Sequence, residues 1–167
     1  CVGGGSSAYG FWSEFIDFDK KQIELIGVEA GGPKGSKLHA APLSRGAKLG
    51  ILHGAAAYVC QDAEGQINET ESISAGLDYP GVSPIHCFLK DTKRARYSSA
   101  TDEDALKAYQ LVTKLEKIKP SLEPCHAFAE AIKIAPKLSK NTIIIVNSCG
   151  DAKKDRDILK SRLRKSN

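Results

Sequence analysis

Three consecutive glycines and two serines stand near the start of the chain, in the run VGGGSSA. Glycine has no Cβ, so the backbone of Gly3, Gly4 and Gly5 can turn tightly and present successive N–H groups. The hydroxyl groups of Ser6 and Ser7 add further hydrogen-bond donors. Donors placed where a helix begins bind anions, because the helix dipole is positive at that end. The run therefore predicts a cradle for a phosphate group.

A helix is predicted directly after the glycine–serine run. Its apolar residues recur at the spacing of one helix face: Ala8, Tyr9, Trp12, Phe15 and Ile16. Either Ser6 or Ser7 is a suitable N-cap. The run has neither the lysine of a P-loop nor the glycine spacing of a dinucleotide fingerprint. A plain strand-to-helix connection therefore stays open as the alternative to a phosphate cradle.

Strands and helices are expected to alternate along the chain. Residues 23–29, IELIGVE, form a short apolar run that predicts a buried strand of a parallel sheet. Residues 30–51 are rich in Gly, Pro, Ser and Lys and predict a long loop. Residues 58–60 and 66–67, joined by the turn sequence DAEG, are typical of a hairpin.

Two helices are predicted in the second half of the chain. Thr101 and Asp104 have the spacing of a capping box, and an apolar stripe follows them. Pro120 ends this helix, and Ser121 begins the next one. The inward face of that next helix is expected at Ala127, Ala131 and Ile134.

A continuous β-branched run at residues 142–147, TIIIVN, predicts the best buried strand in the chain, and a basic terminal helix follows it. Strands and helices in this order predict an α/β fold, with a doubly wound, mostly parallel open sheet and helices on both faces. Ligands of such sheets bind at the carboxyl ends of the strands. The segments GGGSS, SAGLDYP and NSCG all fall at expected strand ends.

Composition places the chain among globular proteins and excludes several classes of partner. The 167 residues, 41% of them hydrophobic, are enough for one domain, 1–167. The net charge of +4 comes largely from the terminal basic helix, where no aromatic residue is present to stack on bases, so we expect no nucleic-acid partner. No apolar run has membrane-spanning length and no signal-peptide pattern occurs, so we expect a cytoplasmic protein without a membrane partner. The chain begins with Cys1 and contains no methionine, which indicates a segment of a longer protein.

The cysteines and histidines show no pattern of a metal site. Five cysteines include no CxxC pair, and their odd number argues against a disulfide framework. The four histidines stand at no ligand spacing from one another. We therefore expect reduced thiols and no transition-metal centre.

Further motifs stand downstream of GGGSS in a fixed order: GVEAGG, LHG, SISAGLDYPGV, ATDEDAL, SLEPCHAFAEAIKIA and IIIVN. In this order and spacing, up to about Asp155, the chain closely resembles the carboxy-terminal half of the tryptophan synthase β chain family. The string ISAGLDYPGV, at its distance from the glycine run, is specific to this resemblance. The family is dependent on pyridoxal 5'-phosphate (PLP) and has the type II fold of PLP enzymes.

The resemblance implies a cofactor role for several residues. The loop that holds the PLP phosphate is matched by Gly3, Gly4, Gly5, Ser6 and Ser7. Gly76 matches a glycine beside the phenolic oxygen of the cofactor, and Glu123 matches a glutamate near its ring. Cys149 stands where the family has a serine at the pyridine nitrogen. Asp78 matches a catalytic aspartate that pairs with an arginine of the other half of the enzyme.

Two of these positions have plainer alternatives. Asp78 is also a suitable turn residue before Tyr79 and Pro80. Glu123 is also a favourable first-turn carboxylate of a helix.

The resemblance further implies a monovalent cation, Na⁺ or K⁺, bound by backbone carbonyls. The matching positions are Val2, Gly3, Tyr79 and Gly81. His53 and Tyr79 match positions that line the indole passage of the family.

The chain departs from the family at several positions close to these motifs. Asp151, Ala152 and Lys153 replace an arginine, a glycine and an aspartate, and Pro124 and Cys125 replace two serines. These changes are compatible with the fold and the cofactor pocket, but they bear on how efficient the parent enzyme is.

The function implied by the resemblance is replacement of the hydroxyl of L-serine by indole, which gives L-tryptophan. The implied partners are the N-terminal half of the same chain, the tryptophan synthase α subunit and a second β chain in a homodimer. No lysine of this chain stands in a context that matches the Schiff-base lysine, so the segment alone is expected to be inactive. Two alternatives stay open, which are a non-catalytic remnant that binds a phosphate ligand or a partner, and another type II PLP lyase or dehydratase.

Overall fold

The computed structural model describes residues 1–164, and the last three residues of the expected domain 1–167 lie outside this part. Within it the elements follow in the order α1 (Ser6–Trp12), η1 (Ser13–Phe15), β1 (Leu25–Ala30), β2 (Lys48–Leu52), β3 (Ala55–Val59), α2 (Pro84–Asp91), β4 (Ala95–Ala100), α3 (Asp102–Glu116), α4 (Leu122–Ile134), η2 (Ala135–Lys137) and α5 (Arg156–Arg164). No helix among these residues is both long enough and apolar enough to cross a bilayer.

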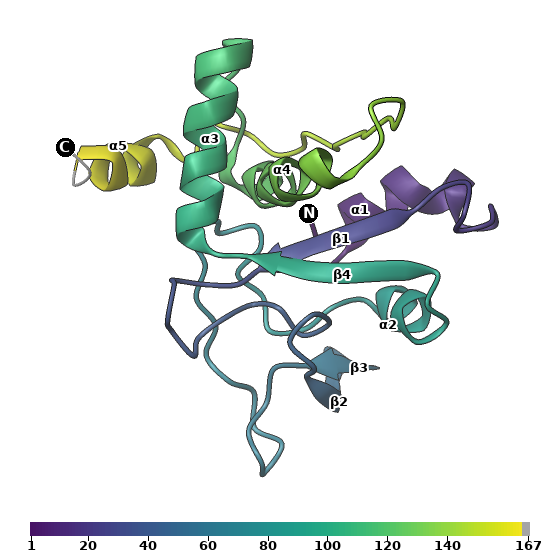
Figure 1. Ribbon diagram of the computed structural model, residues 1–167. Helices are drawn as coiled ribbons and strands as arrows, with labels where there is room; N and C mark the ends of the chain where they lie inside the picture. The colour runs from purple at the N-terminus through teal and green to yellow at the C-terminus, as the bar shows by residue number, and fades with distance from the viewer. Residues whose placement is uncertain (165–167) are drawn as a thin grey trace.

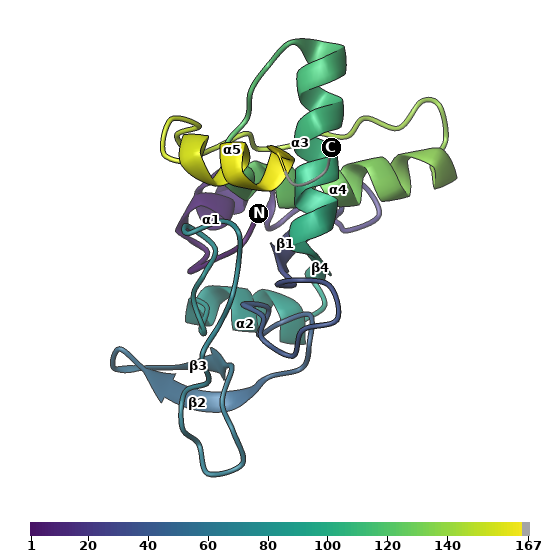
Figure 2. The ribbon, with the colours of Figure 1, turned by 90° about the vertical axis from the view of Figure 1, so that its left-hand side faces the viewer.

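A parallel pair of strands lies at the centre of the fold. Strand β1 pairs with β4, with Leu25 opposite Ala95 and Ala30 opposite Ala100. Helix α4 covers one face of the pair and α2 covers the other (Figures 1 and 2), and α3 packs against α4. The predicted α/β class, with parallel strands and helices on both faces, is confirmed. The sheet is small, with two parallel strands in the described part of the chain.

The predicted strand at residues 142–147 is wrong. This run joins no strand among residues 1–164, and Ile143 and Ile145 are 84% and 72% exposed. β-Branched side chains favour an extended backbone, but a strand also needs a neighbour with free N–H and C=O groups. The described residues supply no such neighbour to this run.

Helix α1 confirms the helix predicted after the glycine run, with η1 continuing it. Its N-cap is Gly5 rather than Ser6 or Ser7, and no side chain caps it. Gly5 has φ of 101°, a value that glycine adopts at no steric cost. The serines therefore enter the first turn of the helix instead of capping it.

A hairpin is present, but not where the sequence predicts it. Strands β2 and β3 pair across a two-residue turn in which His53 and Gly54 both have positive φ. This is the geometry of the tight hairpin turns, whose first residue is usually asparagine, aspartate or glycine, so histidine is uncommon there. At the predicted position the chain forms a turn closed by one bridge, between Gln61 and Ile67.

Helices α3 and α4 begin where the sequence predicts them. Thr101 and Asp104 form the capping box of α3, with each backbone N–H bonded to the other side chain. Helix α4 presents a different face from the predicted one, because its Leu122 and Cys125 pack against α3 and α5. The residues expected to face inward are only half-buried: Ala127, Ala131 and Ile134.

Candidate functional site

The glycine loop before α1 is held from two sides by backbone hydrogen bonds. The N–H of Val2 donates to the carbonyl of Val28 in β1 over 2.8 Å. The N–H of Ser83, just before α2, donates to the carbonyl of Gly4 over 2.9 Å. The loop is therefore attached both to the sheet and to the segment that leads into α2.

Gly5 is the most tightly constrained residue of this loop. A Cβ at Gly5 would lie 2.2 Å from Cδ2 of His86. Nε2 of His86 lies 2.8 Å from the carbonyl oxygen of Gly5, and Nδ1 lies 2.8 Å from the Tyr97 hydroxyl. A carbonyl only accepts, so Nε2 carries the proton and Nδ1 accepts from Tyr97. This chain of hydrogen bonds connects the loop to α2 and β4.

Burial keeps this histidine neutral. It lowers the pKa of His86, although the hydrogen bond to Gly5 acts in the opposite direction. Burial likewise raises the pKa of Tyr97. Sequence reasoning assigned no role to either residue, since nothing in the local sequence indicates that they meet below the loop.

The beginning of α1 presents backbone donors to solvent. The first N–H groups of a helix have no acceptor within the helix, and here no side chain caps them. Gly4, Ser6 and Ser7 are exposed. Ser7 Oγ accepts from the side chain of Asn147, over 3.3 Å, which brings the segment before Cys149 next to the loop. This end of α1 can therefore accept an anion.

Three glycines allow distant segments to meet beside this loop. A Cβ at Gly3 would lie 2.7 Å from the carbonyl oxygen of Gly76, and one at Gly76 would lie 2.4 Å from Oε1 of Glu123. A Cβ at Gly150 would lie 3.0 Å from Oε2 of the same glutamate and 2.4 Å from Oγ of Ser121. We call Gly3, Gly76, Gly150 and Glu123 the glycine–glutamate cluster.

Glu123 is buried and forms an ion pair with Lys154 through Oε1. Burial by itself raises the pKa of Glu123, but the hydrogen bond from Lys154 and the positive charge outweigh burial and hold this pKa below its ordinary value. Oε2 is buried without a hydrogen-bond partner in the described part of the chain. Ser121 lies close by, but its hydroxyl donates to the carbonyl of Cys149 over 2.8 Å. The cluster therefore contains a carboxylate oxygen that has no hydrogen-bond partner among residues 1–164.

Cys149 also lies at this cluster. Its neighbour Gly150 has positive φ, which turns the chain tightly over Ser121 and Glu123. The Sγ atom of Cys149 lies 3.6 Å from Sγ of Cys1. The structure thus brings together the predicted cofactor residues from the glycine loop, Gly76, Glu123 and Cys149.

The structure does not gather Asp78 and the predicted cation residues in one cavity. Asp78 is exposed and makes no hydrogen bond or ion pair within residues 1–164. Tyr79 and Gly81 line a cavity of about 240 Å³ that also borders Gly4 and His53. The Tyr79 hydroxyl lies 2.8 Å from Nδ1 of His53. Val2 and Gly3, the other predicted cation residues, do not line this cavity.

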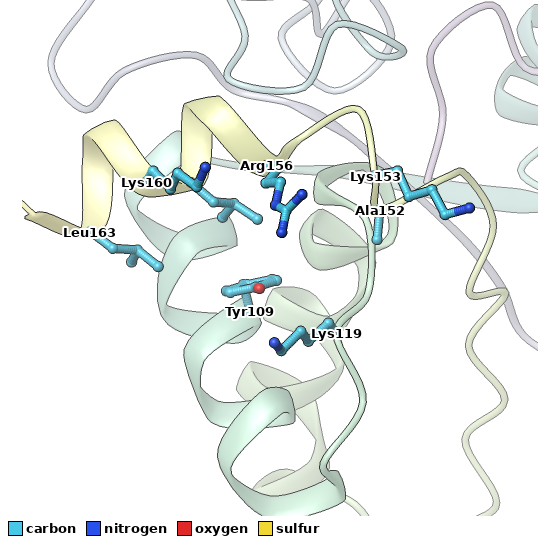
Figure 3. A pocket seen from close by; sticks show the side chains of 8 residues that line it. Tyr109, Lys119, Ala152, Lys153, Arg156, Lys160 and Leu163 are labelled. Atoms are coloured by element: carbon cyan, nitrogen blue, oxygen red, sulfur yellow. The ribbon is translucent and has the colours of Figure 1, made fainter.

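A larger cavity, of about 840 Å³, lies apart from these residues, between α3 and α5. Figure 3 shows the ring of Tyr109 with the side chains of Lys119 and Arg156 extending toward it. Lys153, one of the departures from the family, also lines it. None of the predicted site residues lies there.

Comparison with known proteins identifies the family. No protein-family model matches the chain. The tryptophan synthase beta chain of Chromobacterium violaceum is 51% identical over 156 residues, which are 93% of this chain and 38% of that protein. The corresponding protein of Vesicomyosocius okutanii is 51% identical over 158 residues, or 93% of this chain and 39% of that protein. That of Bradyrhizobium sp. is 45% identical over 170 residues, or 99% and 41%.

The chain spans about two fifths of the length of the curated relatives it matches. The identity extends over nearly the whole of this chain, which includes the glycine loop and the segments of the glycine–glutamate cluster. Over the part of the family that it spans, the chain belongs to the tryptophan synthase beta chain family.

Proposed function

We propose that this chain forms the carboxy-terminal, cofactor-phosphate domain of a tryptophan synthase β chain, a PLP-dependent enzyme that converts L-serine and indole into L-tryptophan. The observation that carries the proposal is the glycine–glutamate cluster beside the glycine loop. Three residues without side chains let the glycine loop, Gly76 and Gly150 pack around one buried carboxylate, next to a helix start whose N–H groups have no side-chain cap. This combination suits one ligand that carries both a phosphate group and an aromatic ring.

The residues present fit PLP in three respects. The exposed donors at the start of α1 suit a phosphate dianion. The absence of a Cβ at Gly3 and Gly76 lets the glycine loop, the carbonyl of Gly76 and the carboxylate of Glu123 lie directly against one another, as a small ligand that contacts all three requires. Oε2 of Glu123 is a buried acceptor without a partner in the part of the chain that the structure describes, and such a group is usually paired. A bound ligand would supply the missing contact.

Each group of this chain then has a defined task. The loop from Gly3 to Ser7 binds the phosphate, and His86 holds the loop in place through the carbonyl of Gly5. When bound, PLP stabilises negative charge at the α-carbon of the amino-acid substrate, which allows the serine hydroxyl to be replaced. Cys149 is the partner of the ring nitrogen. A thiol is a weak neutral donor, so it leaves that nitrogen unprotonated, which favours elimination over transamination.

Other parts of the enzyme complete the site. The N-terminal half of the β chain would supply the Schiff-base lysine and the arginine that pairs with Asp78. We propose the α subunit and a second β chain as further partners, and a monovalent cation bound by carbonyls near Tyr79 and Gly81. The chain alone lacks the Schiff-base lysine and is inactive.

Two titrations test the phosphate assignment. PLP added to the ¹⁵N-labelled chain is expected to shift the amide signals of Gly4 and Gly5, whereas pyridoxal, which has no phosphate, is expected to leave them in place. Binding should be weak, since ordering a loop costs about 1–2 kcal/mol per residue. Equal shifts with both compounds, or saturation at micromolar PLP, would contradict the proposal.

Reduction with borohydride tests the proposal that this chain contains no Schiff-base lysine. After incubation with PLP and borohydride, peptide mass mapping is expected to show no lysine that is modified stoichiometrically at a single site. Sparse adducts spread over exposed lysines are the background that pyridoxal alone also gives. A single, fully modified lysine would show that the chain holds its own Schiff-base residue.

A further inference from the structure

Cys1 and Cys149 form a thiol pair in this chain, whereas the family resemblance implies a serine at position 149. Their sulfur atoms lie 3.6 Å apart, which is close to van der Waals contact. Both thiols are free and half-buried. A disulfide bond is about 2.05 Å long, so the two sulfur atoms must approach by about a further 1.5 Å to form one.

The backbone on each side of this pair is held in place. The residue after Cys1 donates to Val28 of β1, and Cys1 itself packs against the small apolar group of Ala30, Ala40 and Leu77. The carbonyl of Cys149 accepts from the hydroxyl of Ser121. The two sulfur atoms are thus presented to each other by ordered segments, 148 residues apart in the sequence.

The other cysteines have a different environment. Cys60, Cys87 and Cys125 are buried, and burial raises the pKa of each, to about 11 for Cys60 and about 12 for Cys125. The thiolate is the reactive form, so these three thiols are poor partners in exchange. Selective oxidation is therefore directed to Cys1 and Cys149.

We propose that Cys1 and Cys149 are a redox modification site, which a low-molecular-weight disulfide converts into an intramolecular disulfide. The first thiolate attacks the oxidant, here oxidised glutathione, and releases one reduced glutathione. The second thiolate then attacks the protein–glutathione disulfide and releases another. The two protein thiols lose two protons and two electrons, and the oxidant gains both.

The consequence for the cofactor site rests on the proposed function. Cys149 precedes Gly150 in the glycine–glutamate cluster, and Cys1 lies two residues before Gly3. The bond removes the thiol that faces the ring nitrogen and draws Cys149 toward the glycine loop. Loss of one hydrogen bond of this kind corresponds to roughly a three- to tenfold loss of PLP affinity.

The test begins with the full chain and oxidised glutathione, followed by alkylation of the remaining thiols and peptide mapping. The expected product has lost two hydrogen atoms and yields a linked peptide that contains Cys1 and Cys149. Cys87→Ser should give the same linked peptide, whereas Cys149→Ser should give only a glutathione adduct on Cys1. Separate glutathione adducts on both cysteines, or links to another cysteine in the unaltered chain, would overturn the proposal.

A second measurement separates this inference from the proposed function. The shifts of Gly4 and Gly5 on addition of PLP are compared between the reduced chain and the linked chain. Weaker binding in the linked form supports redox control of the site. Equal binding in both forms overturns that control, and absence of binding in the reduced chain overturns the proposed function while the disulfide result stands on its own.

Discussion

Replacing Gly5 with alanine is expected to lower the free energy of unfolding by about 3 kcal/mol or more, through two independent effects. The backbone of Gly5 has φ of 101°, a conformation that costs any residue with a side chain about 1–3 kcal/mol. The added methyl group would also lie 2.2 Å from Cδ2 of His86, so the ring must move. Such overpacking costs a further 1–3 kcal/mol or so.

Moving His86 has consequences beyond the loop. The ring is fully buried, bonds to both Gly5 and Tyr97, and contacts the edge of Trp12. Displacing the ring therefore breaks the link between the loop and the sheet. The folded chain loses stability, and the phosphate cradle loses its shape.

Gly4→Ala is the matched control, because a Cβ at Gly4 would meet no atom within 4 Å and its φ is not positive. Urea unfolding of both variants provides the measurement. Gly4→Ala should change the free energy of unfolding by less than about 1 kcal/mol. Similar losses for the two variants would show that the constraint at Gly5 is absent in solution.

Acidification from pH 7 to pH 5 is expected to remove about 2 kcal/mol of stability through His126 alone. This histidine is completely buried, and burial lowers its pKa from 6.5 to about 4. Its Nδ1 donates to the carbonyl of Leu122, and Nε2 is buried without a partner among the described residues. The folded chain therefore holds the neutral ring.

The direction follows from proton binding. Below pH 6.5 the unfolded chain binds a proton at His126 that the folded chain does not bind until about pH 4. The contribution of His126 to the free energy of unfolding is fully present above pH 6.5, and it is lost as the pH falls from 6.5 to about 4. Each unit of the pKa difference corresponds to about 1.4 kcal/mol.

Other buried groups titrate in the same range, so the comparison requires a variant. His86 adds to the loss in acid, whereas the raised pKa values of Glu29, Asp102 and Asp155, each due mainly to burial, act in the opposite direction. In His126→Leu these other contributions remain and the contribution of His126 is absent. Between pH 7 and pH 5, the free energy of unfolding of the unaltered chain should therefore fall by about 2 kcal/mol more than that of His126→Leu. A constant difference between them would mean that His126 is protonated in the folded chain or accessible to solvent.

Prediction from sequence succeeded where the determining contacts are local. The helix after the glycine run, the strand at residues 23–29 and the capping box of Thr101 and Asp104 all depend on residues within one or two turns of each other. The order of the motifs along the sequence also indicated the tryptophan synthase beta chain family, and the comparisons confirmed this family. The roles assigned to individual cofactor residues stay predictions.

Prediction failed where a neighbour distant in sequence decides the outcome. The run at residues 142–147 has every local property of a strand, but ladder partners are a property of the assembled sheet. Helix α4 has a helical apolar period, but its packing against α3 and α5 decided which face is buried. The tight turn at His53 and Gly54 was missed because a histidine with positive φ carries no common signal.

By itself, the sequence determined the residue types available for chemistry, several of the helices, the strand at residues 23–29 and the family, because these are carried by local pattern and by the succession of motifs. Only the tertiary structure decided that His86 and Tyr97 support the glycine loop, that Lys154 pairs with Glu123, and that Cys1 faces Cys149. Each of these contacts joins residues from segments that are well separated in the sequence. Their partners are selected by how the helices pack on β1 and β4, and that packing is a cooperative result of the whole chain.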